Sequence, residues 1–442
     1  MHLYTRNINT AFRELIQFFK DGRDDRKETF FQRRNPVVHK PSRVGDVLVI
    51  SEPVTITYSH PRERVLFNAA RDANPFFHLY ESLWMLAGRR DIAPLAYYSS
   101  GYAKQVQDGD SPYANGAYGY RWRHAVTTLG DDMVGPDNFE YDQLQLLIQH
   151  LKADPNSRRA VLTMWNVEDD LLKIGLNCSN CGYPKSNSNH DDCCPDGQAH
   201  DNIKPSKDVC CNLNALFLMR YDPDEGPACT CGADRTGPSA EAHKPKCPAG
   251  VPRVQTPRTY LDMTVTNRSN DLIWGTLGSD YVNLGFLQEY MVAHLGVEVG
   301  VYNQFSNNLH VYVDRFKPEE WLKEEDRQPF GFHTSNPDDW GAQYRDWKTV
   351  PLVKDPATFD KELPEFVEAH KDKDASSREK DWQEPFLADV AAPMLRAFHA
   401  YKKRGATTMS WTQRIKADDW RIVAMQWIER RLNRRGGDAV QV

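Results

Sequence analysis

Residues 267–283, NRSNDLIWGTLGSDYVN, form the stretch from which the rest of the chain is best interpreted. The stretch opens with an arginine suited to an anionic ligand, continues through a polar Ser-Asn-Asp cluster and reaches Asp280 in a glycine-rich turn. Residues 260–266 before it have the length and apolar content of a buried strand, and residues 284–295 after it have the pattern of a helix ended by Gly296. Two regular elements therefore frame a polar turn.

Strand and helix patterns alternate along the rest of the chain. Alternating residues predict a strand or hairpin arm over 47–58, and a glycine closes a predicted helix over 75–88. Residues 159–165 and 213–220 have the apolar content of buried strands, and residues 297–302 alternate again. Mixed strands and helices in this order predict an α+β fold built on one mostly buried sheet.

Two polar stretches and a helical tail interrupt this pattern. Residues 177–207 and 223–257 hold almost no large apolar residues and are rich in Cys, Pro, Gly and Asp, so neither can form a core of its own. Residues 382–437 are helical again, with apolar positions that share a face. We expect a single catalytic domain over 1–442 with two Cys-rich insertions and a helical C-terminal extension.

Composition limits the classes of function. The net charge of −6 is mild and both signs are spread along the 442 residues, so no basic surface for nucleic acid is evident. The N-terminus lacks the pattern of a signal peptide, and no run is long enough to span a membrane. A soluble protein of the cytoplasm, or of a host cytoplasm, is expected. Nine cysteines in such a compartment favour thiolate chemistry or metal binding over disulfides.

Arginines and a cysteine pair are the first candidates for chemistry. Arg158 and Arg159 stand side by side before a predicted strand, and Arg268 opens the polar turn. Guanidinium groups bind a phosphate dianion through paired hydrogen bonds, although an arginine pair alone is more often a solvated strand edge. Cys210 and Cys211 begin the strand CNLNALF, where a thiol can be inert packing or, near arginines, a nucleophilic thiolate.

Three further positions have the chemistry of a binding or catalytic site. Glu81 shares a helical face with apolar residues, which predicts a raised carboxyl pKa and proton transfer through water, or simply a boundary glutamate beside Arg89. Tyr118 lies in GAYGYRWR, whose glycines allow close backbone approach, although core packing explains a tyrosine nearly as well. His310 and Tyr312 are two apart on a strand and thus face the same side.

Cysteine and histidine spacing in the insertions suits tetrahedral zinc. A Cys-x2-Cys pair is followed after eleven residues by a Cys-Cys pair, and a Cys-x-Cys pair is followed after eleven by His-x3-Cys. We predict a structural zinc knuckle, against the alternative of a flexible loop with incidental thiols. The predicted ligands are Cys178, Cys181, Cys193, Cys229, Cys231 and Cys247, with Cys194, His190 and His200 as competitors.

These blocks, taken in this order, resemble the thymidylate synthase family over residues 42–312, and most closely its phage-like branch, which carries GAYGYRWR and RSND together. The resemblance implies a large mixed sheet with flanking helices, a pyrimidine nucleotide substrate and methylenetetrahydrofolate as cofactor. It also implies a homodimer in which Arg158 and Arg159 reach into the partner's site.

The resemblance also implies roles for single residues. Phe217 sets the register that selects Cys211 as the nucleophile on C6 of the pyrimidine, with Cys210 in place of the family's proline. Glu81 corresponds to the glutamate that manages an ordered water, and Tyr118 to a tyrosine near the nucleophile. The implied phosphate ligands are Arg43, Arg158, Arg159 and Arg268, with Ser269 beside them, while His310 and Tyr312 bind the deoxyribose and Asp271 and Trp84 the folate.

Two departures from the family's pattern predict the reaction. Asp280 replaces an asparagine that reads uracil, and a carboxyl can offer cytosine the donor and acceptor that it requires. The spacing from Gly275 is one residue longer than usual, so a shifted register would place Ser279 at the base instead. The tryptophan-bearing segment that shields the methylene group is replaced by YYSSGYAKQVQ at 97–107, which favours attack by water over reduction.

The sequence therefore predicts a deoxycytidylate hydroxymethylase, with Asp280 as the base reader. Two alternatives stay within the same chemistry: a thymidylate synthase that tolerates Asp280, and a deoxycytidylate methyltransferase. A third is a nucleic-acid-binding zinc module on a non-catalytic scaffold, which Cys211 and the arginines disfavour.

Overall fold

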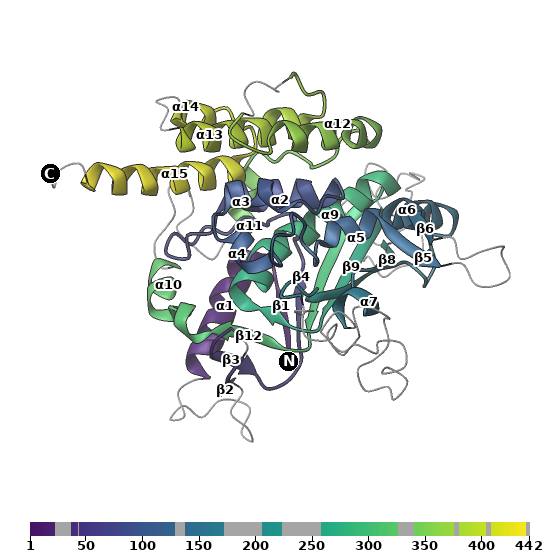
Figure 1. Ribbon diagram of the computed structural model, residues 1–442, viewed down its shortest axis with the longest axis horizontal. Helices are drawn as coiled ribbons and strands as arrows, with labels where there is room; N and C mark the ends of the chain where they lie inside the picture. The colour runs from purple at the N-terminus through teal and green to yellow at the C-terminus, as the bar shows by residue number, and fades with distance from the viewer. Residues whose placement is uncertain are drawn as a thin grey trace, which may run out of the picture.

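The computed structural model describes residues 1–22, 37–42, 44–128, 138–171, 206–222, 258–325, 340–374, 380–403 and 408–438. Figure 1 shows their arrangement as a sheet region, a central layer that contains helices α2 (Pro75–Leu86) and α9 (Ser279–Leu295), and an outer layer of C-terminal helices. The central layer is the part of the fold that connects the other two.

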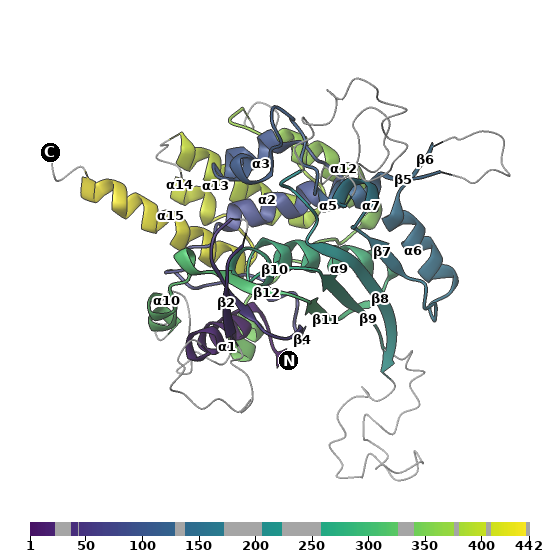
Figure 2. The ribbon, with the colours of Figure 1, turned by 60° about the horizontal axis from the view of Figure 1, so that its bottom comes forward.

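The main sheet has six strands of mixed direction, in the order β1-β4-β11-β9-β8-β7. Strand β11 runs parallel to β9 and antiparallel to β4, while β8 is antiparallel to both β9 and β7. Figure 2 shows α9 lying along one face of β8, β9 and β11. The strands are β1 (His2–Thr5), β4 (Val54–Tyr58), β7 (Val161–Thr163), β8 (Asn212–Asp222), β9 (Arg258–Asn267) and β11 (Glu298–Ser306).

A smaller four-stranded sheet, ordered β10-β12-β3-β2, flanks the polar turn. Its strands are β2 (Val37–Lys40), β3 (Val47–Ile50), β10 (Asn270–Asp271) and β12 (Leu309–Tyr312). The predicted strand or hairpin arm over 47–58 is thus divided, because β3 joins this sheet whereas β4 joins the main one. A two-stranded ribbon of β5 (Ala125–Thr128) and β6 (Asn138–Tyr141) completes the strands among the described residues.

Helix α2 lies in the middle of the core. Every residue of α2 except His78 is buried, as expected for a helix that is apolar around most of its circumference. Asn74 caps its first turn by accepting from the backbone N–H groups of Phe76 and Phe77 at 3.2 Å. Helix α5 (Tyr118–Arg123) crosses α2 so closely that a Cβ on Gly119 would lie 2.0 Å from the carbonyl oxygen of Met85. Only glycine fits at that crossing.

The remaining helices surround this core. Helices α1 (Ile8–Asp21) and α10 (Pro318–Glu325) pack beside the smaller sheet, and α6 (Gln143–Ala153) lies against α9. Shorter helices are α3 (Ile92–Tyr98), α4 (Tyr102–Val106), α7 (Val167–Asp170) and α11 (Trp340–Asp346).

The C-terminal layer packs directly on α2 and α3. The ring of Phe398 lies 5.3 Å from that of Phe76 and 4.9 Å from that of Tyr98, centroid to centroid. The hydroxyl of Tyr98 donates to the carbonyl of His370 at 2.7 Å, which ties α3 to the same layer. The layer consists of α12 (Pro356–Ala369), a π-helical turn (Leu387–Ala391) that leads into α13 (Ala392–Lys402), α14 (Thr408–Thr412) and α15 (Asp418–Asp438), so it begins earlier than the predicted boundary at residue 382.

Two sequence-based expectations need correction. Strand β8 is not buried on both faces, because Leu216 and Leu218 are 39% and 55% exposed while Ala215 and Phe217 between them are buried. The apolar run therefore belongs to a strand with one open face. The predicted helix over 284–295 begins at Ser279, so Asp280 lies in the first turn of α9 and not in a loop.

No helix in the described ranges is both long and apolar enough to cross a membrane. Apart from residues 206–207, the Cys-rich insertions lie outside the described residues. The expected location in the cytoplasm and the single-domain organisation stay predictions.

Replacing Phe398 with Ala tests whether the C-terminal layer belongs to the same cooperative unit. Phe398 is 2% exposed, so truncation should lower the free energy of unfolding by about 3–5 kcal/mol. The matched control is Leu432→Ala on α15, which is 38% exposed and should cost about 0.5 kcal/mol or less. Urea denaturation followed by tryptophan fluorescence gives both values. Two separate transitions, or a negligible effect of Phe398→Ala, would contradict a single cooperative unit.

Candidate active site

Cys211 and Arg268 form the centre of the site, where the start of β8 meets the end of β9. The Arg268 Nη2 atom lies 3.9 Å from Cys211 Sγ and donates to the carbonyl of Val209 at 3.1 Å, and its Nε donates to the carbonyl of Cys210 at 2.8 Å. Cys211 is half-buried, whereas Cys210 is 1% exposed and its thiol faces the Gly116 carbonyl at 3.7 Å. Of the two thiols, only Cys211 faces the arginine.

The thiol of Cys211 is not activated within the single chain. Burial raises its pKa to about 11, although the charge of Arg268 acts to lower it. Arg158 and Arg159 are exposed and make no ion pair within the described residues, so the contribution expected of them across a dimer interface stays a prediction. Arg43 lies outside the described residues.

Two carboxyl groups with perturbed pKa values lie on neighbouring helices. Asp280 accepts from the Asn212 amide at 3.4 Å, and burial raises the pKa of Asp280 to about 6. Glu81 on α2 accepts from the Asn283 amide at 3.0 Å, and burial raises its pKa to about 8. The charge of Asp280 adds to the rise at Glu81, so these two predicted site residues lie within electrostatic reach of each other.

Tyr118 joins these groups to the nucleophile. The backbone N–H of Cys211 donates to the Tyr118 hydroxyl at 3.4 Å. Burial raises the phenol's pKa well above its usual value, and the charges of Asp280 and Cys211 act in the same direction. The predicted position of Tyr118 beside the nucleophile agrees with this geometry.

Tyr102 and Asp208 belong to the same cluster and were not singled out from the sequence. Burial raises the pKa of the Tyr102 phenol, and the charges of Glu81, Asp208 and Asp280 add to it. Asp208 accepts from the Gly116 backbone N–H at 2.7 Å, and burial raises its pKa to about 6. Two features of the sequence could have indicated them. Tyr102 lies in the segment 97–107 that departs from the family's pattern, and Asp208 lies three residues before Cys211.

Asp271 and His310 come together from paired strands. Asp271 in β10 is the register partner of His310 in β12, whose ring lies 5.5 Å from that of Tyr312. His310 and Tyr312 thus share a face, as predicted. One oxygen of Asp271 accepts from the backbone N–H groups of Ile273 and Trp274 at 2.8 and 2.6 Å and so caps the turn that precedes α9. Ser269 is half-buried beside Arg268.

Trp84 is a predicted site residue that the structure does not bring to this cluster. Its side chain is fully buried in the core, and its indole N–H donates to Asp91 at 3.0 Å. The exposed tryptophan near the site is Trp274, which is 43% exposed and has the guanidinium groups of Arg71 and Arg315 each 5.7 Å from its ring.

The zinc prediction falls on residues outside the described part of the chain. Within the described residues, no group of three or more His, Cys, Asp or Glu side chains could hold a metal ion. Zinc bound by the insertion cysteines stays a prediction, which the metal content of the purified protein would test.

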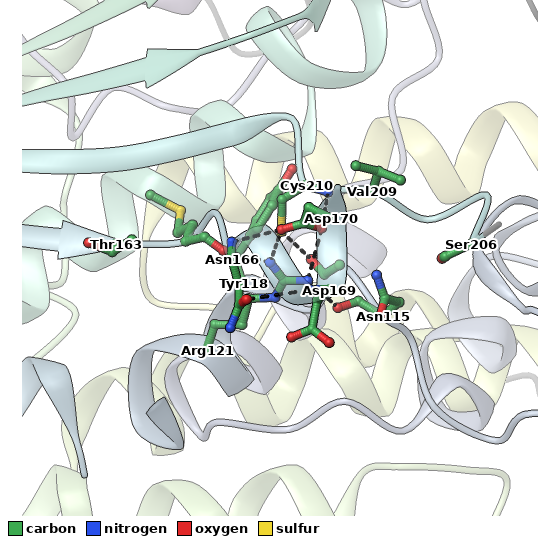
Figure 3. Close-up of polar contacts among 12 residues, drawn as sticks. Asn115, Tyr118, Arg121, Thr163, Asn166, Asp169, Asp170, Ser206, Val209 and Cys210 are labelled. Carbon is green, nitrogen blue, oxygen red and sulfur yellow. Dashed lines mark hydrogen bonds and ion pairs between the residues drawn. The ribbon is translucent and has the colours of Figure 1, made fainter. Parts of the chain in front are cut away.

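A buried ion pair lies next to Cys210, the residue before the predicted nucleophile (Figure 3). Asp170 at the end of α7 is fully buried and pairs with Arg121 of α5. Its carboxylate also accepts from the backbone N–H of Cys210 at 3.3 Å and from that of Asn166 at 2.9 Å. In the sequence, the charged residues that lie among apolar and aromatic ones in YGYRWR and NVEDDLL could have indicated a buried ion pair.

The raised pKa of Glu81 predicts a pH-dependent stability. A neutral Glu81 is favoured in the folded chain, so its contribution is complete below about pH 4.5 and is lost as the pH rises through about 8. Glu81→Gln cannot ionise, so the variant should gain stability relative to wild type over that range, at about 1.4 kcal/mol per pKa unit. Urea denaturation at several pH values measures the difference, with exposed Glu298→Gln as the control. A difference that does not change with pH would contradict a neutral buried Glu81.

The chain matches known proteins in its sequence. A family model described as thymidylate synthase matches residues 64–183. A deoxyuridylate hydroxymethyltransferase from Pseudomonas phage M6 is 33% identical over 410 residues, which cover 91% of each chain. A protein of the same description from Bacillus phage SP01 is 31% identical over 282 residues, covering 62% of this chain and 54% of that protein.

Among solved structures, the thymidylate synthase of T4 phage superposes with a TM-score of 0.40 at 16% identity, over 72% of this chain and 81% of that one. The near-complete coverage of the Pseudomonas phage relative is what identifies the family, and the predicted α+β fold with its mixed sheet and flanking helices is confirmed. The chain belongs to the thymidylate synthase family of one-carbon transferases, in a branch that it shares with phage hydroxymethyltransferases.

Proposed function

We propose that the chain transfers a one-carbon unit to C5 of a 2′-deoxypyrimidine 5′-monophosphate and releases a 5-hydroxymethyl product, with dUMP as the substrate. The observation that carries the proposal is the convergence of a half-buried thiol, Cys211, with Arg268, Tyr118 and the acidic pair of Glu81 and Asp280. The descriptions of the two phage relatives support hydroxymethylation and dUMP.

In this reaction Cys211 is the nucleophile. Its thiolate adds to C6 of the pyrimidine, and the electron pair of the C5–C6 bond makes C5 nucleophilic. Methylenetetrahydrofolate, when bound, supplies the one-carbon unit. Loss of the C5 proton, together with departure of tetrahydrofolate from the transferred carbon, then leaves an exocyclic methylene group on the pyrimidine. Water adds to that methylene carbon, the C5–C6 double bond re-forms, and Cys211 leaves as a thiolate, so no reductant is consumed.

Activation of Cys211 requires more positive charge than one chain provides. At a pKa of about 11, only a small fraction of the thiol is ionised near neutral pH. Guanidinium groups of Arg158 and Arg159 from a second chain would add to the effect of Arg268 and bind the substrate phosphate. Both side chains are exposed and available for such a role.

A dimer of this kind has a surface on which to form. Val161, Leu216 and Leu218 are exposed on the open face of β7 and β8, at 38%, 39% and 55%. Apolar side chains gathered on one sheet face favour burial against another protein surface. Arg158 and Arg159 immediately precede β7, so a partner on this face would receive them.

The acidic cluster suits addition of water. Glu81, with a pKa of about 8, is mostly neutral near pH 7 and can donate a hydrogen bond, whereas Asp208, with a pKa of about 6, is mostly ionised and can accept a proton. The Tyr102 hydroxyl lies under the electrostatic influence of both. These three groups can orient a water and take up its proton, as hydroxymethylation requires.

Base choice depends on the protonation of Asp280. A neutral carboxyl has one donor and one acceptor oxygen, so it can pair with N3–H and O4 of uracil as an amide does. With the proton on the other oxygen it pairs with N3 and the amine of cytosine. A pKa of about 6 makes protonation at pH 7 cost only about 1.4 kcal/mol. Asp280 therefore suits uracil as well as cytosine, and dCMP stays the second candidate.

The residues near Asp271 fit a folate. Trp274 exposes an aromatic face for a planar ring, and Arg71 and Arg315 beside it suit the carboxylates of a glutamate tail. Asp271 commits one oxygen to the turn, and its second oxygen is the group that would accept from a ring N–H.

Incubation with dUMP and methylenetetrahydrofolate should yield 5-hydroxymethyl-dUMP and tetrahydrofolate, measured by liquid chromatography with mass spectrometry and by the absence of dihydrofolate absorbance. Formation of dTMP with dihydrofolate would contradict hydroxymethylation, and turnover of dCMP alone would replace dUMP as the substrate. Asp280→Asn provides the matched variant. An amide cannot move a proton between its two ends, so the ratio of dUMP to dCMP turnover should rise at least about tenfold.

Mixing two inactive variants tests the shared site. Cys211→Ser and the double variant Arg158→Ala/Arg159→Ala should each be inactive alone but regain activity when their subunits exchange, because the mixed dimer holds one complete site. The control pairs Cys211→Ser with Glu81→Gln. Both residues belong to the same chain's site, so no complete site forms and no activity should return. Equal results for the two mixtures would contradict arginines contributed by the partner.

A further inference from the structure

Hydrogen bonds to neighbouring residues involve most backbone polar atoms of the nucleophile segment, residues 209–211. On one side, Arg268 donates to the carbonyls of Val209 and Cys210 and, through its own backbone N–H, to that of Cys211 at 3.0 Å. On the other side, the Cys211 N–H donates to the Tyr118 hydroxyl and the Cys210 N–H donates to Asp170. The segment therefore cannot shift without breaking a bond to a charged or phenolic group.

The Asp170 carboxylate is the most constrained of these partners. It is fully buried and pairs with Arg121, whose guanidinium also donates to the carbonyls of Met164 at 2.7 Å and Asn115 at 2.9 Å. The side chains of Arg121 and Asp170 thus join the end of β7, the turn before α5 and the start of β8, and Figure 3 shows them adjacent to Cys210. A buried carboxylate held at several points has one position available, and so does the N–H bound to it.

The bond from Cys210 requires a backbone N–H, which proline does not have. The family pattern described above has proline at this position, where a fixed φ angle limits the segment in another way. In this chain the hydrogen bond from the Cys210 N–H to the buried Asp170 carboxylate restrains the segment in place of a proline ring. The thiol of Cys210, by contrast, faces the Gly116 carbonyl at 3.7 Å.

We propose that Asp170, fixed by Arg121, is a positioning residue for the nucleophile, and that Cys210 contributes its backbone N–H to this contact and not its thiol. The inference rests on the proposed function in one respect, namely that Cys211 is the nucleophile. Asp170 acts on Cys211 through the neighbouring peptide group. A loosened segment would move the thiol away from Arg268 and from the substrate carbon that it attacks.

The test compares Cys210→Pro, which removes the N–H, with Cys210→Ala, which removes only the thiol. With dUMP, the kcat of Cys210→Pro should be on the order of 10²-fold lower than that of Cys210→Ala with a similar KM, because a small displacement of a reacting atom has that effect. Alkylation of Cys211 by iodoacetamide, followed on its own peptide by mass spectrometry, should become faster in Cys210→Pro because the released thiol is more exposed. Peptides with the other cysteines serve as internal controls for global unfolding.

Asp170→Asn gives the second arm, with Asp169→Asn as its neighbouring control. Asp170→Asn should lower kcat and speed alkylation of Cys211, and combining it with Cys210→Pro should add little, since both remove one contact. Equal kcat values and equal alkylation rates for Cys210→Pro and Cys210→Ala would overturn the proposal, as would fully additive effects of the two changes. Alkylation needs no turnover, so a failure of the substrate assignment would leave this result interpretable.

Discussion

The buried ion pair between Arg121 and Asp170 is the interaction on which the site depends. It joins α5 and α7 to the segment that carries Cys211. That segment precedes β8, which begins at Asn212, so strand pairing within β8 does not hold it. Breaking such a pair by removing one partner costs about 3–5 kcal/mol, since the remaining charge stays buried. A strong interaction thus fixes a short loop. Such restraint is expected if the loop must place a sulfur atom within bonding distance of a substrate carbon.

Burial raises the pKa of the acids and of the nucleophile alike, but the rise is useful only for the acids. Burial raises the pKa of Glu81 to about 8 and of Asp280 to about 6, which places both near the pH at which proton transfer is useful. The same burial raises the pKa of Cys211 to about 11, which is unfavourable for a nucleophile. Further positive charge is needed at the thiol, and the exposed Arg158 and Arg159 are the available source. This imbalance is the reason for proposing that a second chain contributes these arginines to the site.

Much of the site could be predicted from sequence because its residues lie in short blocks of fixed spacing. Cys211, Arg268, Tyr118 and Glu81 come from four separate blocks, and the fold brings them together. Burial and protonation could not be predicted in the same way. The sequence does not show that Trp84 is buried in the core, that 47–58 divides between two sheets, or that Tyr102 lies within electrostatic reach of both Glu81 and Asp208. The identity of the base is a similar case, because Asp280 suits uracil or cytosine according to which oxygen holds a proton.

The most direct measurement locates the covalent bond to the pyrimidine. In 5-fluoro-dUMP a fluorine replaces the hydrogen that must leave C5, so the adduct formed with methylenetetrahydrofolate cannot proceed to product and can be digested and sequenced by mass spectrometry. The account predicts the nucleotide on Cys211, with no adduct in Cys211→Ser. A nucleotide on Cys210, or on neither thiol while turnover of dUMP continues, would contradict it.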